Sequence, residues 1–265
     1  MPTESPIFHA SPHQHLKVSC MLLRDYATLM LDSGATARRI EQSVRRIATA
    51  WGIKADISIL PQRVLLALWD ITEQHSYTCV GHKSSLGINI GTVARLNRLS
   101  YIIEERHLSP AMAEACMKRI AGMPGWDARL VLLLVSCANA SFCRLFGGDA
   151  SAMGIVFLAT LLGFHIKQRF LKHHIDPRLT TLFSAFSAAV TSTAGYVFGY
   201  THTPEIAVGT SVLFLVPGIP FANGASDMLS RHYVCALSRL TDALVTTFCL
   251  STGLCAALYI TGFQW

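Results

Sequence analysis

The chain has 265 residues, of which 51% are apolar and only 14% charged, and its mean hydropathy is +0.40. Soluble globular domains carry charge on about a quarter of their residues, so this composition disfavours an ordinary soluble protein and indicates a lipid-facing portion. The net charge is +6, but the basic residues form no aromatic-interleaved stripe, and nucleic-acid binding is not expected.

The charged residues are concentrated in the first half of the chain. Residues 1–129 hold 15 of the 22 Lys and Arg residues and 11 of the 16 Asp and Glu residues. We therefore expect a disordered tail over residues 1–15, a cytoplasmic α+β domain over residues 16–128, and a transmembrane domain over residues 129–265.

The cytoplasmic part predicts two amphipathic helices followed by a small sheet. Apolar residues recur at helical spacing over 18–30 and over 40–51, with Ser33-Gly34 as the break between them. The period then changes to two over 53–59. Further strand-like runs follow at 64–69, at 75–80 and, as an additional candidate, at 86–90.

Two more helices are predicted before the membrane part. The first runs through Val93, Leu96 and Ile103. The second begins at Ser109-Pro110, because Ser is a favoured helix cap and Pro is favoured at the first helical position.

Five apolar windows in the second half are long enough to cross the roughly 30 Å of a bilayer core. They lie at 130–146, 150–166, 179–200, 205–228 and 242–263. The chain is therefore predicted to be an α-helical polytopic membrane protein with about five transmembrane helices.

The loop charges predict the direction of these windows. Lys and Arg occur in the second connection, from Lys167 to Arg178, and in the fourth, at Arg231 and Arg239. The first and third connections and the C-terminal tail contain neither. Because short cytoplasmic loops retain positive charge, we expect a multi-pass membrane protein with its N-terminus on the cytoplasmic side and its C-terminus on the opposite side.

The fourth window contains two prolines and a glycine within four residues, namely Pro217, Gly218 and Pro220. Each proline removes a backbone donor and clashes with the preceding turn, so the helix is expected to break here and to resume at Pro220. Secondary transporters place broken helices at their substrate sites, where a helix N-terminus can face a substrate carboxylate. We therefore assign these residues to a substrate pathway.

Two polar residues follow the break on one helix face, Asn223 and Asp227. Asp227 is either an intramembrane carboxylate with a role in proton coupling or an interfacial acid paired with Arg231. Both Asn223 and Asp227 are candidate pathway residues.

Two further candidates lie in the first apolar window. Asn139 could make a hydrogen bond that packs helices together or could contact a ligand. Arg144 could line the pathway, or could instead extend outward or pair with Asp149.

The sequence contains no motif of a nucleotide-binding loop, a zinc protease, a serine hydrolase or a dinucleotide-binding fold. No enzyme activity, cofactor or metal is therefore expected. The tail histidines His9, His13 and His15 are interpreted as part of a polar disordered segment rather than as metal ligands.

The motif Leu215-Val-Pro-Gly-Ile-Pro220, continued by Asn223 and Asp227-Met228, resembles the signature of the threonine/serine exporter (ThrE-like) family. Ser136 to Gly148 and the Gly34-Ala35 pair agree with the same family. Full-length members continue into a second membrane half, so the chain is similar to the split, YjjP-type subunit that corresponds to the N-terminal half.

This resemblance implies a subunit of a secondary-active exporter that moves small polar metabolites out of the cell, such as threonine, serine or a dicarboxylate such as succinate. It also implies the bacterial inner membrane as the location, with the C-terminus in the periplasm. It also implies a separate small membrane partner that supplies the second half. The alternatives are a membrane-anchored scaffold or regulator without transport activity, and a membrane-anchored enzyme. A scaffold would not need a broken span, and no catalytic constellation is present in residues 16–125.

Overall fold

The computed structural model describes residues 12–70, 74–84 and 87–263. The chain divides into two compact units. The first unit takes in the described residues up to Pro124 together with Ala222–Leu240, and the second takes in Gly125–Phe221 together with the residues from Thr241 onward. A segment of the predicted transmembrane half thus belongs to the same unit as the N-terminal helices and sheet. The location of the first unit in the cytoplasm stays a prediction.

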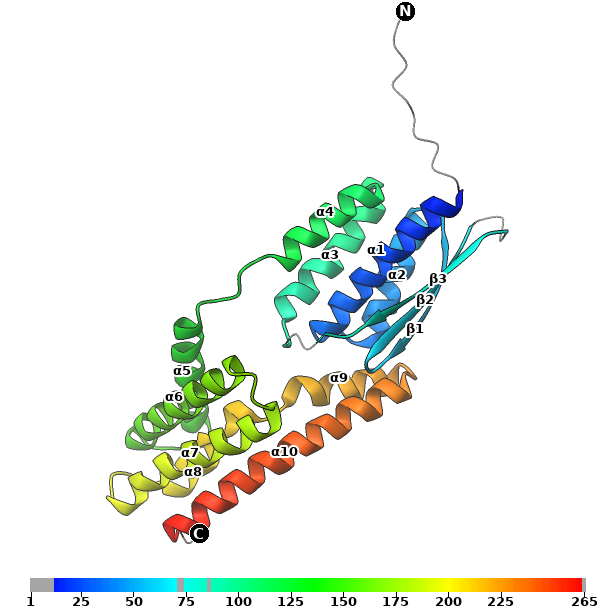
Figure 1. Ribbon diagram of the computed structural model, residues 1–265. Helices are drawn as coiled ribbons and strands as arrows, with labels where there is room; N and C mark the ends of the chain where they lie inside the picture. Colours follow the sequence, from blue (N-terminus) through cyan, green and yellow to red (C-terminus); the bar gives the residue numbers. More distant parts are fainter. Residues whose placement is uncertain (1–11, 71–73, 85–86, 264–265) are drawn as a thin grey trace, which may run out of the picture. The chain divides into compact units, whose positions relative to one another are not determined.

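The first unit contains four helices and a three-stranded sheet in its N-terminal part (Figure 1). In chain order these elements are α1 (Pro12–Asp32), α2 (Ala37–Ala50), β1 (Lys54–Leu60), β2 (Arg63–Trp69), β3 (Ser76–His82), α3 (Ile90–Arg106) and α4 (Pro110–Ala121).

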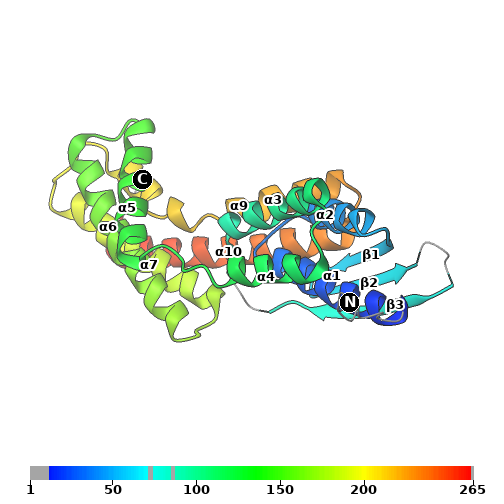
Figure 2. The same cartoon turned by 90° about the horizontal axis from the view of Figure 1, so that it is seen from above.

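The sheet is an antiparallel meander in the order β1-β2-β3 (Figure 2). Its alternating residues bury one face, where Val64, Leu66 and Leu68 are inaccessible to solvent, while Leu65 and Val80 on the other face remain exposed. Helix α1 packs against β2 and β3, and α2 packs against β1, so these two helices cover the buried face. The predicted small sheet is confirmed.

Three of the predicted boundaries can be compared with the structure. The predicted cap at Ser109 is confirmed, because its hydroxyl accepts the Met112 N–H and Pro110 opens α4. The candidate strand at 86–90 is wrong over its described residues, because 87–89 form neither strand nor helix and Ile90 begins α3, while residues 85–86 lie outside the described part. Helix α1 already begins at Pro12, and residues 1–11 of the predicted tail, His9 included, lie outside the described part.

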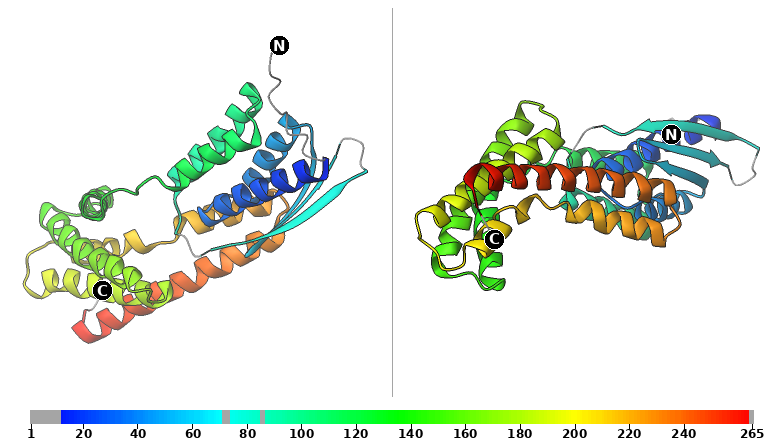
Figure 3. Two further views of the ribbon diagram at one scale, coloured as in Figure 1. Left: turned by 45° about the horizontal axis from the view of Figure 1, so that its top comes forward. Right: turned by 90° about the horizontal axis from the view of Figure 1, so that it is seen from below.

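The second half of the chain is helical throughout (Figure 3). Its elements are α5 (Ala128–Leu145), α6 (Ala150–Lys172), α7 (Pro177–Val197), α8 (Pro204–Ser211), the 3₁₀ turn η1 (Leu213–Leu215), α9 (Gly218–Leu229) and α10 (Tyr233–Thr261). The division between the units falls inside α9 and inside α10, so each of these helices contributes residues to both units.

Three of the helices that the structure describes are long and apolar enough to cross a membrane, namely α5, α6 and α10. The bent pair formed by α8–η1 and α9 gives a fourth candidate if it counts as one span. Helix α7 coincides with the predicted third window and is rich in Ser and Thr. The protein is therefore a mostly helical membrane protein with three to four candidate spans and a small sheet, and the fifth span stays a prediction.

Helices α7 and α10 approach closely in the second unit at Gly253. A Cβ atom at this position would collide with the carbonyl oxygen of Leu182 and would lie 3.1 Å from the Cβ atom of Ala185. Small residues of this kind let helix backbones approach in lipid.

We expect Gly253→Ala to destabilise the protein by about 1–3 kcal/mol, because the added methyl group forces the two backbones apart. Gly154 of α6 provides the matched control, since nothing lies within 4 Å of a Cβ atom built there. Gly154→Ala should be neutral or stabilising by up to about 1 kcal/mol, because Ala is the better helix former. Thermal unfolding in detergent measures both, and equal effects would contradict the close packing at Gly253.

Candidate functional site

The predicted break in the fourth apolar window is present. Helix α8 and η1 end before Val216, α9 begins at Gly218, and the two helical segments are bent by 60°. The second half-helix begins two residues before Pro220, because the Pro217 carbonyl accepts the first helical hydrogen bond, from the Phe221 N–H at 3.2 Å. Pro220 lies in the first turn of α9, where its missing N–H costs no helical bond.

The Asn139 side chain forms hydrogen bonds that link the interrupted helix to neighbouring helices of the second unit. Its Nδ2 atom donates to Thr160 Oγ1 at 2.6 Å and to the Thr210 carbonyl at 3.0 Å. Thr210 is in the last turn of α8, where carbonyl groups lose the partners that a continuing α-helix would supply. This buried amide therefore links α5 and α6 and satisfies a carbonyl near the interruption, which supports the packing interpretation of Asn139.

The buried polar side chains of the second unit, which lie among apolar clusters, are uncharged. Among its described residues, the buried polar side chains are hydroxyl groups and the amide of Asn139. Three of these hydroxyls, on Thr180, Ser184 and Ser192, lie along α7 and have no hydrogen-bond partner within the described part of the chain. Unpaired buried hydroxyls are costly in a dry interior, so this stripe offers hydrogen-bonding groups to water or to a polar solute.

Arg144 and Asp149 do not form the predicted ion pair. Arg144 Nη1 donates instead to the Gly148 carbonyl at 3.2 Å. Asp149 caps α6 by accepting the Ala152 N–H at 2.6 Å, and its other oxygen accepts the His202 N–H at 2.9 Å. These two backbone hydrogen bonds, of which the one from His202 has the larger effect, hold the pKa of the Asp149 carboxyl below its usual value. Asp149 therefore closes the loop before α6 rather than neutralising Arg144.

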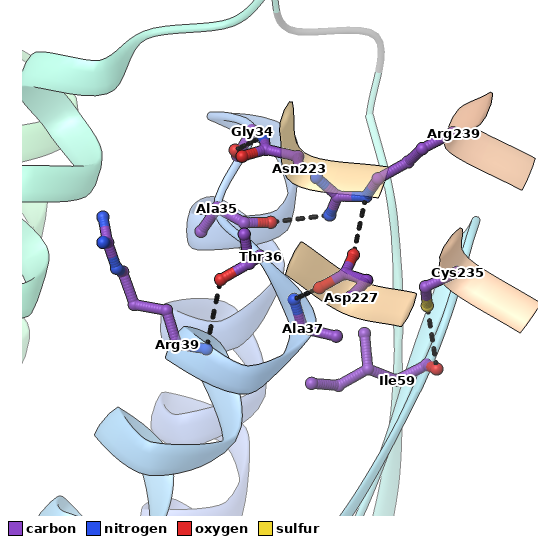
Figure 4. A network of polar contacts seen from close by, with 10 residues as sticks. All are labelled: Gly34, Ala35, Thr36, Ala37, Arg39, Ile59, Asn223, Asp227, Cys235 and Arg239. Carbon is purple, nitrogen blue, oxygen red and sulfur yellow. Dashed lines mark hydrogen bonds and ion pairs between the residues drawn. The ribbon is translucent and has the colours of Figure 1, made fainter. Parts of the chain in front are cut away.

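Asn223 and Asp227 belong to the first unit and contact the turn between α1 and α2 (Figure 4). Asn223 Nδ2 donates to the Gly34 carbonyl at 2.8 Å, and Asp227 Oδ1 accepts the Ala37 N–H at 2.8 Å. Ala37 is the first residue of α2, where backbone donors lack helical partners and a carboxylate is favoured by the helix dipole. The Asn223 and Asp227 side chains thus both bond to the α1–α2 turn of the predicted cytoplasmic domain.

Arg239 completes this arrangement from α10. Its Nε atom lies 3.1 Å from Asp227 Oδ2, and its Nη2 atom donates to the Ala35 carbonyl at 2.6 Å (Figure 4). The Asp227 contact is an ion pair rather than a hydrogen bond, because Oδ2 has no hydrogen-bond partner among the described residues. We refer to Asn223, Asp227 and Arg239 together as the clamp.

Of the two alternatives for Asp227, the pairing with Arg231 is therefore wrong, because its carboxylate pairs with Arg239. The sequence interpretation placed Arg239 in a loop, whereas α10 begins at Tyr233 and carries Arg239 on its second turn. At Gly224 a Cβ atom would lie 2.9 Å from Leu240 Cδ2, so glycine allows α9 and α10 to pack side by side. This packing brings the guanidinium of Arg239 to the carboxylate.

The predicted pathway residues divide between the two units. Five belong to the second unit and two to the first. The five are Pro217, Gly218, Pro220, Asn139 and Arg144, and the two are Asn223 and Asp227. Arg239 was not predicted as a site residue. Within the described residues, no group of three or more His, Cys, Asp or Glu side chains is arranged to hold a metal ion.

Comparison with known proteins gives a consistent result. A family model described as "Putative threonine/serine exporter" matches residues 22–261. The chain is 28% identical over 240 residues to "Probable succinate transporter subunit YjjP" of Escherichia coli (strain K12), covering 89% of this chain and 91% of the relative. The protein of the same name from Klebsiella aerogenes is 26% identical, with 90% and 92% covered.

A more distant relative comes from yeast. The chain is 21% identical over 241 residues to "Pheromone-regulated membrane protein 10" of Zygosaccharomyces rouxii, which covers 88% of this chain but only 24% of that protein. No solved structure matches the chain.

Proposed function

Because the chain belongs to the ThrE family of threonine/serine exporters, we propose that it is one subunit of a secondary-active exporter of small polar metabolites in the bacterial inner membrane. The observation that carries this proposal is the interrupted helix at Pro217, because secondary transporters use discontinuous helices to form substrate sites. The names of the bacterial relatives support a subunit of a larger assembly, and we propose a separate small membrane protein as the partner.

The proposed pathway runs through the second unit beside the break. The N-terminus of α9, at Gly218 and Pro220, would face the substrate carboxylate, since the positive end of the helix dipole favours an anion. The unpaired α7 hydroxyls would supply neutral hydrogen-bonding groups along the route. Threonine, serine and a dicarboxylate such as succinate all carry the required carboxylate.

The orientation in the membrane is part of the same proposal. An N-terminus in the cytoplasm and a C-terminus in the periplasm follow from the loop charges. In this orientation the basic turn between α9 and α10, with Arg231, faces the cytoplasm. Arg239 lies within α10 and is therefore not a loop residue. The proposed orientation consequently depends mainly on the basic residues between Lys167 and Arg178.

Efflux measurements test the proposal. Cells that lack the native export system are preloaded with labelled threonine, serine or succinate, and the chain is expressed alone and together with its candidate partner. Efflux of one of these compounds only when both proteins are present is the expected result. If both proteins are verified in the membrane and none of the three compounds leaves faster than from empty cells, the proposed exporter function is wrong for these substrates and a regulatory function is favoured.

A further inference from the structure

A cavity of about 350 Å³ lies in the first unit, at the C-terminal end of α9 and not at the break before Gly218. Its charged lining residues are Arg38, Glu41 and Arg45 of α2, and Arg231 and His232 of the turn between α9 and α10. The three α2 residues recur at helical spacing and therefore share one face of the helix. The volume is in the range of sites that bind small molecules.

Basic side chains outnumber acidic ones in the lining of this cavity. Among the described residues, Glu41 is the only acidic one that lines it, and its carboxylate is already paired with Arg45 at 2.8 Å and with His232 Nε2 at 3.3 Å. Within the described part of the chain, no hydrogen bond or ion pair engages the guanidinium group of Arg38 or of Arg231. Two arginine side chains thus remain available at the cavity.

Arg231 also occupies a backbone conformation that glycine would adopt more easily. Its φ is +65°, at the position where α9 ends with the Arg231 N–H bonded to the Met228 carbonyl and the His232 N–H bonded to the Asp227 carbonyl. Helices that end in this pattern usually carry glycine at the left-handed residue. An arginine here costs free energy, and such strained residues concentrate at functional sites.

From the cavity, the unpaired guanidinium groups and the left-handed arginine together, we propose that this pocket binds a small dianion, either a dicarboxylate or a phosphate group. Arginine is suited to both, because its planar fork forms paired hydrogen bonds with carboxylate and phosphate oxygens. The pocket is independent of the proposed export pathway, so either assignment can fail without the other.

Isothermal titration calorimetry on the full chain in neutral-lipid nanodiscs tests the pocket, with succinate and inorganic phosphate as probes and zwitterionic threonine as the comparison. The informative variants are Arg231→Gly and Arg38→Gln. Arg231→Gly removes the guanidinium while relaxing the backbone, so its thermal unfolding temperature should not fall. Arg39→Gln is the matched control, because Arg39 is exposed on α2 as Arg38 is, but does not line the cavity.

We expect succinate or phosphate to bind more tightly than threonine, and each of the two pocket variants to weaken that binding at least tenfold, with Arg39→Gln within twofold of the unchanged protein. A second set of nanodiscs containing phosphatidic acid, whose phosphomonoester headgroup approaches a dianion near neutral pH, identifies the source of the anion. If the unchanged protein binds phosphate more weakly in these nanodiscs than in the neutral ones, and Arg231→Gly shows no such difference, a lipid headgroup is supported as the occupant. Equal phosphate binding in both sets of nanodiscs would support a soluble dianion. The proposal is overturned if neither probe binds, or if Arg231→Gly and Arg38→Gln bind as the unchanged protein does.

Discussion

Replacing Asp227 by Ala is expected to destabilise the protein by about 3–5 kcal/mol, the range for breaking one side of a buried ion pair. Asp227 is fully buried, and the side chain of its partner Arg239 is only 18% exposed. The substitution leaves this guanidinium without its counter-charge and also removes the acceptor for the Ala37 N–H. Thermal and denaturant unfolding of the full chain in detergent measure the loss.

Asp242 provides a control on the same helix, α10. Its ion pair with Arg178 has both side chains more than half exposed, at 63% and 54%. Exposed pairs contribute less than about 1 kcal/mol, so Asp242→Ala should have little effect. Equal losses for Asp227→Ala and Asp242→Ala would show that the clamp does not hold the α1–α2 turn.

Asp227→Asn separates the clamp from proton coupling. The amide oxygen can still accept the Ala37 N–H, but the charge opposite Arg239 is lost, so a smaller destabilisation of about 1–3 kcal/mol is expected. Proton coupling by Asp227 stays a prediction. It is excluded if Asp227→Asn, at equal amounts in the membrane, leaves the export rate and its pH dependence unchanged.

The break at Pro217 could be predicted from the sequence because its cause is local. A proline lacks the N–H and clashes with the preceding turn wherever it occurs within a helix, and no tertiary contact is needed to know this. The same holds for Ser109-Pro110, where two adjacent residues specify a helix start. The sheet followed from an apolar period of two, which also needs only neighbouring residues.

The clamp could not be predicted in this way. The Asn223 side chain and the Gly34 carbonyl are 189 positions apart in sequence, and nothing in the periodicity of either segment indicates their contact. Gly34-Ala35 and Asn223 with Asp227 were both part of the family resemblance, yet a single sequence does not show that they meet. The partner of Asp227 was missed for a further reason, since an apolar window cannot show that α10 extends beyond it to Tyr233.

Asn139→Ala is expected to cost about 1–3 kcal/mol, because it removes the buried donor to the Thr160 hydroxyl and to the Thr210 carbonyl. Asn139→Asp should cost more, since a carboxylate has no donor for that carbonyl and would itself be buried. Ser141→Ala is the control on α5, because Ser141 is exposed and its hydroxyl bonds within its own helix to the Cys137 carbonyl. It should change stability by less than about 0.5 kcal/mol.

The same variants decide between the two interpretations of Asn139. If the amide packs helices, Asn139→Ala lowers the unfolding temperature, and transport falls in proportion to the amount of folded protein while the KM for the exported compound is unchanged. If the amide contacts the substrate, KM rises while the unfolding temperature remains at that of Ser141→Ala. Because Nδ2 already donates both of its hydrogens to Thr160 and Thr210, the amide has no donor left for a solute in this arrangement, and we expect the first result.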